Sequence, residues 1–305
     1  MKNHRNSSEA KKQTKKKIFA AKADNLEYRS NLVEVEWAQI APDTIVVATE
    51  DRAWLSRPRA GKTGFTKPME GLGSVATTQK LLDGAIAAAR YAVNSDVRPP
   101  ALTATRWVWR LASQYHLSHT YPLLIEKAAR RFEQANRSVL AQWATEKVLE
   151  ERGHDLLALR DIQSLKYDAE AVVEELIPPA AVTLIDYLSR SVRDSDPVDC
   201  VGYSYTMERL ALGIDEKYIQ KVEALLPSNS RATRCLLIHS SVGGDVAHVK
   251  ETAEMVAGLT AFERVRIARA CYETALLCFS PPSEDYILDN ELQKILNPLK
   301  LDHNL

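Results

Sequence analysis

Long segments without helix breakers dominate the sequence after residue 77, and they limit the fold more than any other feature. Within each segment apolar residues recur every three or four positions, which is the period of an amphipathic helix. Glycine supplies only 11 of the 305 residues, so few positions interrupt the pattern. We therefore predict roughly eight or nine helices. The segments are residues 78–94, 102–116, 121–165, 169–191, 198–212, 216–226, 230–259, 261–279 and 283–296.

The same segments predict the domain organisation. No period of fixed length repeats among them, which argues against a solenoid and favours one helical bundle of about 200 residues. We place this helical domain at residues 77–297 and a C-terminal tail at 298–305. Before it we predict a disordered basic tail, residues 1–24, and an N-terminal extension with a loop, residues 25–76. The predicted class is all-α, with some β or extended structure in the extension.

Strand signals occur in the N-terminal extension. Residues 33–37 (VEVEW) alternate apolar and polar side chains, and residues 44–49 (TIVVAT) are rich in β-branched side chains. The loop that follows contains Gly61-Lys62, which resembles the end of a phosphate-binding loop. That motif needs a glycine five positions earlier, where this chain has Ser56. We therefore predict no nucleotide site in this loop.

Charge and cysteine content exclude several classes of function. The chain carries 40 Lys+Arg and 40 Asp+Glu, so no overall field draws it to nucleic acid or to an anionic membrane. Its apolar stretches are far shorter than the roughly 20 residues of a membrane-spanning helix. The 4 cysteines form no CxxC pair, and the N-terminus has no apolar core of a secretory signal. We expect a cytoplasmic protein with reduced thiols and with neither membrane nor nucleic-acid partners.

Carboxylates and histidines pair at helical spacing in two of the segments. Glu151 precedes His154 by three positions, which places them about 60° apart around a helix, where both can converge on one ion. Glu150 is an alternative carboxylate for this pair. Asp245 and His248 repeat the same three-residue step. Two helices thus each offer a carboxylate and an imidazole.

Glu208 adds a third acidic position, in a segment whose pattern predicts a largely buried helix. A buried carboxylate needs a partner, which is either an arginine such as the adjacent Arg209 or a metal ion. With the two pairs above, Glu208 describes a bundle interior rich in carboxylates and histidines. Such an interior is typical of sites for two iron or manganese ions.

The order of these residues resembles that of the heme-oxygenase-like diiron oxidases, whose helical fold is shared with thiaminase II and pyrroloquinoline quinone synthase. The resemblance covers roughly residues 77–281 and includes the segments GHDLLALRDIQSL and HSSVGGDVAHV. It implies a heme-oxygenase-like bundle that binds two iron ions, with manganese as the alternative metal. The implied metal ligands are Glu151, His154, Glu208, His239, Asp245 and His248.

One spacing departs from the family pattern. The family arranges its last ligands as His-x3-Asp-x2-His, whereas here His239 precedes Asp245 by six positions. In an unbroken helix His239 would lie roughly opposite His248, because nine residues turn about 900°. The glycine pair at 243–244 permits a kink that would re-aim His239. The alternative is that Ser241 takes the first-histidine position and His239 is a core residue.

The resemblance also implies a reaction class. It is O2-dependent oxidation of a small molecule, such as an amino acid or a fatty acid, in a biosynthetic pathway. Electrons would come from an external donor where the reaction needs them. Arg209 and Arg234 are weak substrate-binding candidates, because guanidinium groups clamp carboxylates. A homodimer is one assembly that we consider.

Two alternative functions remain open. A metal-independent member of the same fold, a hydrolase or a cofactorless oxidase, would use Glu208 as acid or base, or Cys235 as a nucleophile of the thiaminase kind. A non-catalytic binding protein would keep the bundle but not the site. Metal content tests the first alternative. Alanine substitution of Glu208 or His248 tests the second, since it would then leave activity and ligand affinity unchanged.

Overall fold

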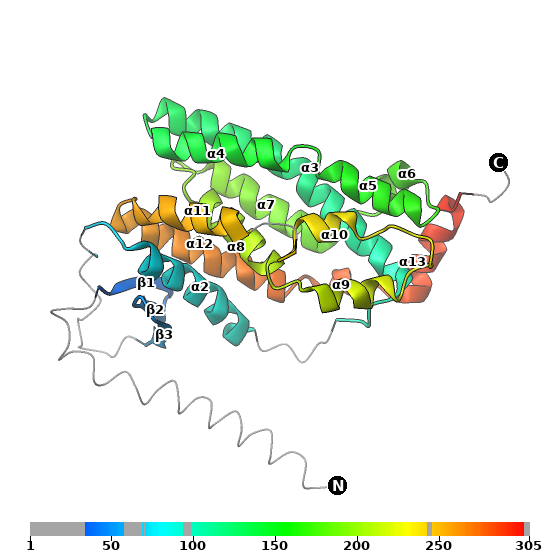
Figure 1. Ribbon diagram of the computed structural model, residues 1–305, viewed down its shortest axis with the longest axis horizontal. Coiled ribbons are helices and arrows are strands. Elements are labelled where there is room, and N and C mark those ends of the chain that lie inside the picture. Colours follow the sequence, from blue (N-terminus) through cyan, green and yellow to red (C-terminus); the bar gives the residue numbers. More distant parts are fainter. Residues whose placement is uncertain (1–33, 58–68, 70, 94–98, 243–245, 302–305) are drawn as a thin grey trace, which may run out of the picture.

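The computed structural model describes residues 34–57, 69, 71–93, 99–242 and 246–301. The predicted basic tail, the glycine–lysine pair at 61–62 and residues 243–245 lie outside the described residues. The described part is a bundle of helices with a small sheet against one side, as Figure 1 shows. The predicted all-α class and the β structure in the extension are therefore confirmed.

The described elements follow one another along the chain with short connections. The strands are β1 (Glu36–Ala41), β2 (Thr44–Ala48) and β3 (Ala53–Ser56). The α-helices are α2 (Val75–Ala92), α3 (Ala104–Gln134), α4 (Ser138–Glu151), α5 (Asp155–Ser164), α6 (Ala169–Glu175), α7 (Pro179–Arg193), α8 (Asp199–Ala211), α9 (Glu216–Glu223), α10 (Arg234–Ile238), α11 (Val246–Ala257), α12 (Ala261–Phe279) and α13 (Asp289–Leu296). Short 3-10 helices are η2 (Ser283–Tyr286) and η3 (Asn297–Leu299). None of the described helices has the length and apolarity that a membrane crossing requires.

Helix boundaries differ from the predicted segments in three places. α3 continues through Pro122, where we predicted a break, because its packing against α4, α5 and α7 outweighs the one hydrogen bond that proline cannot donate. The predicted segment 121–165 instead divides at two left-handed residues, Asn136 with φ 57° and Gly153 with φ 88°. The predicted segment 230–259 divides into α10 and α11. The last two breaks shape the candidate site.

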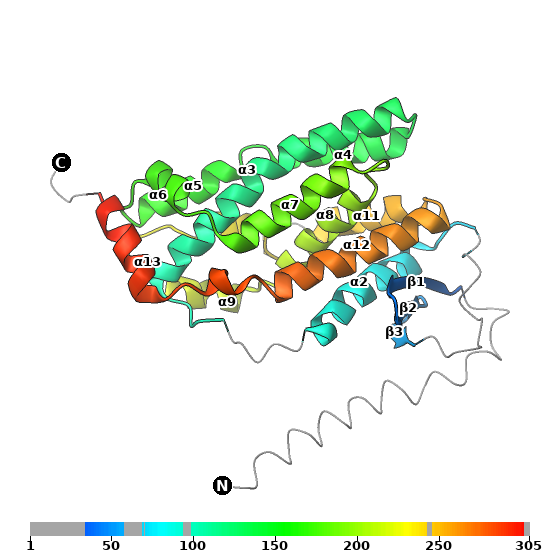
Figure 2. The same cartoon turned by 180° about the vertical axis from the view of Figure 1, so that it is seen from behind.

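The sheet is an antiparallel meander in the order β1-β2-β3, with Trp37 opposite Val47 and Val46 opposite Leu55. It packs on α2 and α12, which lie beside it in Figure 2. A glycine in α2 permits this close packing, since a Cβ at Gly84 would lie 2.8 Å from Cγ1 of Val46. The extension is thus part of the main hydrophobic core.

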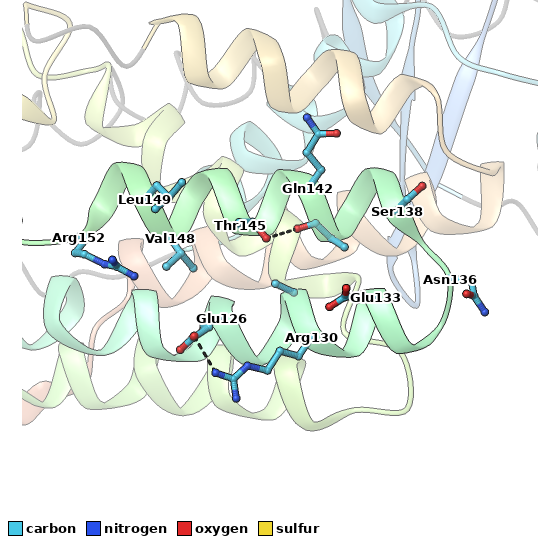
Figure 3. A pocket seen from close by; sticks show the side chains of 12 residues that line it. Glu126, Arg130, Glu133, Asn136, Ser138, Gln142, Thr145, Val148, Leu149 and Arg152 are labelled. Atoms are coloured by element: carbon cyan, nitrogen blue, oxygen red, sulfur yellow. Dashed lines mark hydrogen bonds and ion pairs between the residues drawn. The ribbon is translucent and has the colours of Figure 1, made fainter.

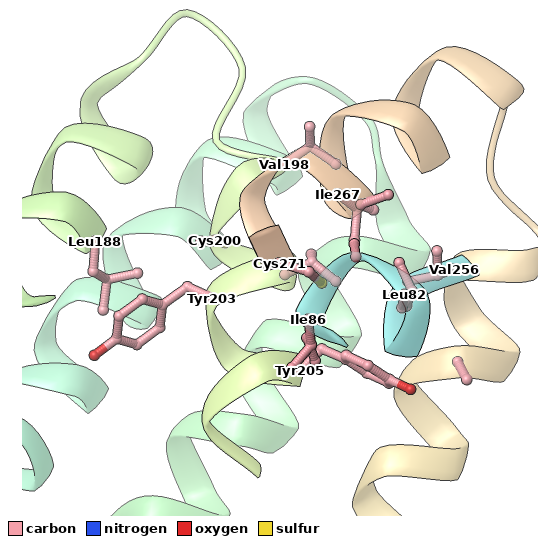
Figure 4. Packing of buried hydrophobic residues seen from close by; sticks show 14 of the residues in the cluster. Leu82, Ile86, Leu188, Val198, Cys200, Tyr203, Tyr205, Val256, Ile267 and Cys271 are labelled. Carbon is pink, nitrogen blue, oxygen red and sulfur yellow. The ribbon is translucent and has the colours of Figure 1, made fainter. Parts of the chain in front are cut away.

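The main core also packs α8 tightly against α12, and Figure 4 shows side chains of this cluster. Gly202 of α8 makes the approach possible. A Cβ at this position would lie 2.5 Å from the carbonyl oxygen of Ile267 and 2.6 Å from Cβ of Ala270. The contact fixes the position of α8, which carries Glu208.

A buried ion pair joins the sheet to the bundle. Glu36 of β1 lies 3.2 Å from Nε of Arg264 in α12, and the two side chains are 3% and 1% exposed. Thr78 of α2 donates a hydrogen bond to Glu36 at 3.0 Å. Arg264 also donates to the carbonyl oxygens of Gly71 and Leu259. Buried charges persist only when they are paired in this way.

Candidate metal centre

The C-terminal end of α4 places adjacent carboxylates in the candidate site. α4 ends at Glu151, and Gly153 then takes a left-handed φ of 88° that glycine adopts without cost. This turn brings His154 back, so that its Nδ1 lies 2.8 Å from Oε2 of Glu151. The predicted pair therefore meets, but the predicted helical geometry is wrong, because a turn separates the two residues.

His239 joins this pair to form what we call the first triad, Glu151, His154 and His239. Nε2 of His239 lies 3.9 Å from Oε2 of Glu151, and the two imidazole rings meet edge to face with centroids 4.8 Å apart. One ligand atom from each residue lies within 4.8 Å of the others. Two imidazoles and one carboxylate are the donor set of many non-heme Fe(II) sites. The first triad therefore fits a divalent ion.

Asp161 of α5 holds the segment that carries His239. His239 is the C-cap of the short helix α10. At the other end of α10, the fully buried Asp161 accepts a hydrogen bond from the backbone N–H of Cys235 at 2.9 Å and one from Arg234 at 3.0 Å. Because α5 begins directly after His154, one helix supports the positions of both histidines.

The chain between His239 and His248 is not a single helix. α10 ends at Ile238 and α11 begins at Val246, so the expectation that His239 points away from His248 does not hold. Ser241, the alternative at the first-histidine position, is exposed and donates to the carbonyl oxygen of Ile214 at 2.9 Å. Asp245, a predicted ligand, lies outside the described residues, and its role stays a prediction.

Glu150, Glu208 and His248 form a second triad, again with one ligand atom from each residue within 4.8 Å of the others. Nε2 of His248 lies 3.7 Å from Oε1 of Glu150. The side chain of Glu208, from α8, is 10% exposed. Glu150 and Glu151 were alternatives in the sequence, yet each contributes to a different triad. That any of these residues binds metal stays a prediction.

Lys147 lies between the carboxylates of the second triad. Its Nζ is 2.8 Å from Oε2 of Glu150 and 2.9 Å from Oε1 of Glu208, and its side chain is only 3% exposed. Burial alone lowers the pKa of Lys147, but the two carboxylates outweigh burial and raise the pKa above its ordinary value. The ammonium group therefore stays charged, and the second triad already faces one positive charge.

The charges of the first triad favour ligation as well. Burial raises the pKa of Glu151, but His154, His239 and Lys147 together lower it below its ordinary value. Glu151 is therefore ionised at neutral pH, as a metal ligand must be. Tyr121 of α3 senses both triads. Burial and then the carboxylate of Glu208 raise the pKa of Tyr121 well above its ordinary value, with a smaller contribution from Glu151.

The two predicted substrate-binding arginines have carboxylate partners within the chain. Nε of Arg209 lies 2.8 Å from Asp83 of α2, which also accepts a hydrogen bond from Tyr205. Arg234 pairs with Asp161 at 3.0 Å. These contacts join helices to one another, and a role in binding substrate stays a prediction.

Cys235 has the properties of a core residue. It is 1% exposed, and burial raises the pKa of its thiol far above the ordinary value. A thiol in this state is a poor nucleophile, because the thiolate is the reactive form. The structure therefore does not favour the thiaminase-like alternative that would use Cys235.

Our reading of the sequence missed Lys147, although a signal for it was available. The buried stripe of α4 contains Leu140, Trp143, Ala144 and Val148, at the spacing of one helix face. Lys147 falls on the same stripe, where a charged side chain must be paired. A lysine on an apolar stripe close to two glutamates indicates a buried ion pair.

A surface hollow of about 640 Å³ lies between α3 and α4, lined by residues such as Glu126, Arg130 and Arg152 (Figure 3). Its described lining contains no residue of either triad. The hollow faces away from the carboxylates at the end of α4, and we assign it no role in the chemistry of the site.

Comparisons with known proteins concern the fold. No protein-family model matches the sequence, and no curated protein matches it. Two solved structures are similar. One is a domain of unknown function with a heme oxygenase-like fold from Shewanella denitrificans, with 20% identity over 72% of this chain and 85% of that chain and a TM-score of 0.49. The other is a TenA homolog from Pseudomonas syringae pathovar tomato, with 11% identity over 70% of this chain and 98% of that chain and a TM-score of 0.46.

Proposed function

We propose that this chain is a non-heme iron oxidase or oxygenase that uses O2 to oxidise a small molecule. The observation that carries the proposal is the pair of triads, which bring three carboxylates and three imidazoles together from helices α4, α8 and α11 and from the turns that follow α4 and α10. Carboxylate and imidazole donors suit iron and manganese better than soft metals. The first triad would hold one ion and the second triad another.

Bound iron would supply the electrons and the open coordination positions that O2 activation needs. The chain's own contribution is to orient the ligands. The turn at Gly153 aims His154 at Glu151, and α10 aims His239 at the same carboxylate. The side chains of the first triad are only 17–18% exposed, which limits the access of bulk water to a reacting molecule.

Anaerobic loading with Fe(II), followed by metal analysis and by rapid mixing with O2, tests the proposal. We expect iron to bind and a transient visible absorption band to follow O2 addition. His154→Ala should abolish both, because it removes an imidazole of the first triad. His119→Ala is a matched control, since His119 is 53% exposed and its Nδ1 faces Asp155 rather than the triads.

The same experiment decides between this proposal and the alternatives. A chain that binds no iron and is unaffected by His154→Ala would contradict the proposal. Glu208→Ala would then be the next variant to assay, because the metal-independent alternative assigns acid or base chemistry to Glu208. If that variant also left every activity and ligand affinity unchanged, a non-catalytic binding protein would be the better description.

A further inference from the structure

The two triads differ in what lies between their carboxylates and imidazoles. In the first triad, Glu151 faces His154 and His239 directly. In the second triad, the ammonium group of Lys147 contacts Glu150 and Glu208 at 2.8 and 2.9 Å. A divalent ion bound to the same carboxylates would stand about 2 Å from their oxygens. The ammonium group therefore occupies the space that a second metal ion needs.

We infer that Lys147 is a built-in cation of the second triad, so that the chain binds one metal ion readily and a second only when Lys147 moves out. This inference rests on the proposed function and adds to it the order of metal binding. The ammonium group offsets the charge of two buried carboxylates, which would be costly to leave unpaired. It thus keeps the metal-free second triad assembled, and it competes with the metal ion that the triad fits.

A metal titration without O2 tests this inference through binding alone. The protein is titrated with Mn(II), and the signal of free Mn(II) is followed by electron paramagnetic resonance. The variant is Lys147→Met, which keeps most of the side-chain volume and removes the charge. Lys127→Met is the matched control, because Lys127 is an exposed lysine of α3.

We expect the wild-type chain and Lys127→Met to bind one Mn(II) tightly and a second weakly. In Lys147→Met the second ion should bind roughly ten- to hundredfold more tightly, which is the range by which residues next to ligands change metal affinity. The first affinity should change little, because Lys147 contacts the carboxylates of the second triad.

Other outcomes overturn different claims. Two equal sites in both wild type and Lys147→Met would overturn the role of Lys147 and leave the proposed function intact. One site in both would also overturn the role of Lys147. No binding in either protein would overturn the proposed function itself.

A second measurement on the wild-type chain covers the case in which Lys147→Met does not fold. Reductive methylation of lysines, read by peptide mass spectrometry, reports whether an amine is accessible. Lys147 should stay unmodified with one equivalent of Mn(II) and become modified when a second ion is bound, while Lys127 is modified throughout. Protection of Lys147 with two ions bound would contradict its displacement.

Discussion

At the scale of single residues, the first triad depends on neighbours that do not themselves bind metal. His154 reaches Glu151 because Gly153 takes a left-handed conformation. His239 is held through α10, whose first turn is anchored on Asp161. Such residues set the geometry of ligands, and changing them should alter metal affinity without removing a ligand.

Gly153→Ala tests the first of these neighbours. A Cβ at Gly153 meets nothing within 4 Å, so the effect should come from backbone strain of about 1–2 kcal/mol. We expect lower stability together with weaker metal binding. Gly71→Ala is the control, because Gly71 also has a left-handed φ, of 80°, with open space around it. Chemical denaturation and metal titration should separate them, and equal metal affinity in both variants would contradict the role of the turn.

Asp161 gives a prediction on pH. Burial raises the pKa of Asp161 above its ordinary value of 3.8, although hydrogen bonds from Cys235 and Arg234 lower it. The folded chain therefore holds this proton more tightly than the unfolded chain does. The stability gained from protonation is complete below the ordinary pKa and is lost as pH rises through the folded pKa.

The matching variant is Asp161→Asn, which keeps an acceptor for the Cys235 N–H but does not titrate. We expect the free energy of unfolding of the metal-free wild type, relative to this variant, to fall as pH rises from about 3 to about 6. Urea denaturation at several pH values measures it. A difference that stays constant over this range would show that Asp161 is not the group responsible.

At the scale of elements, the position of α8 matters because it carries Glu208 to the second triad. α8 approaches α12 at Gly202, where an added methyl group would lie 2.5 Å from a backbone oxygen. Backbone atoms cannot move aside as the end of a flexible side chain can. The packing of these two helices therefore limits where the carboxylate of Glu208 can lie.

Gly202→Ala should consequently destabilise the chain by about 1–3 kcal/mol, the usual cost of overpacking a core. Gly258→Ala is a useful comparison, since the nearest atom to its added Cβ lies at 3.4 Å, an ordinary contact. Thermal unfolding of the two variants measures the difference. Equal melting temperatures would mean that α8 and α12 can separate at little cost.

The sequence predicts the elements better than it predicts their ends. Apolar spacing locates α2, α8, α9 and α12 closely, because one buried face determines each helix. It does not reveal the breaks at Asn136 and Gly153, which depend on single left-handed residues inside otherwise helical patterns. Spacing within an assumed helix correctly pairs Glu151 with His154, but it cannot assign Glu150 and Glu151 to separate triads, since that depends on which helices pack against α4.

At the scale of the whole molecule, the sheet and the bundle share one core, and their link includes the buried pair of Glu36 and Arg264. Glu36→Ala would leave the Arg264 guanidinium buried without its carboxylate, which typically costs about 3–5 kcal/mol. The exposed pair of Glu126 and Arg130 provides the control, because Glu126→Ala should cost no more than about 0.5 kcal/mol. Urea denaturation compares the two, and similar losses would contradict a structural role for the buried pair.

The adjacency of Glu150 and Glu151 also bears on how this site could change over evolutionary time. Neighbouring helical residues point about 100° apart, so one helix end serves two triads only in a single rotational register. An insertion or deletion of one residue within α4 would turn both carboxylates away together. The two triads are therefore gained or lost as a unit by length changes in α4, and only point substitutions can separate them.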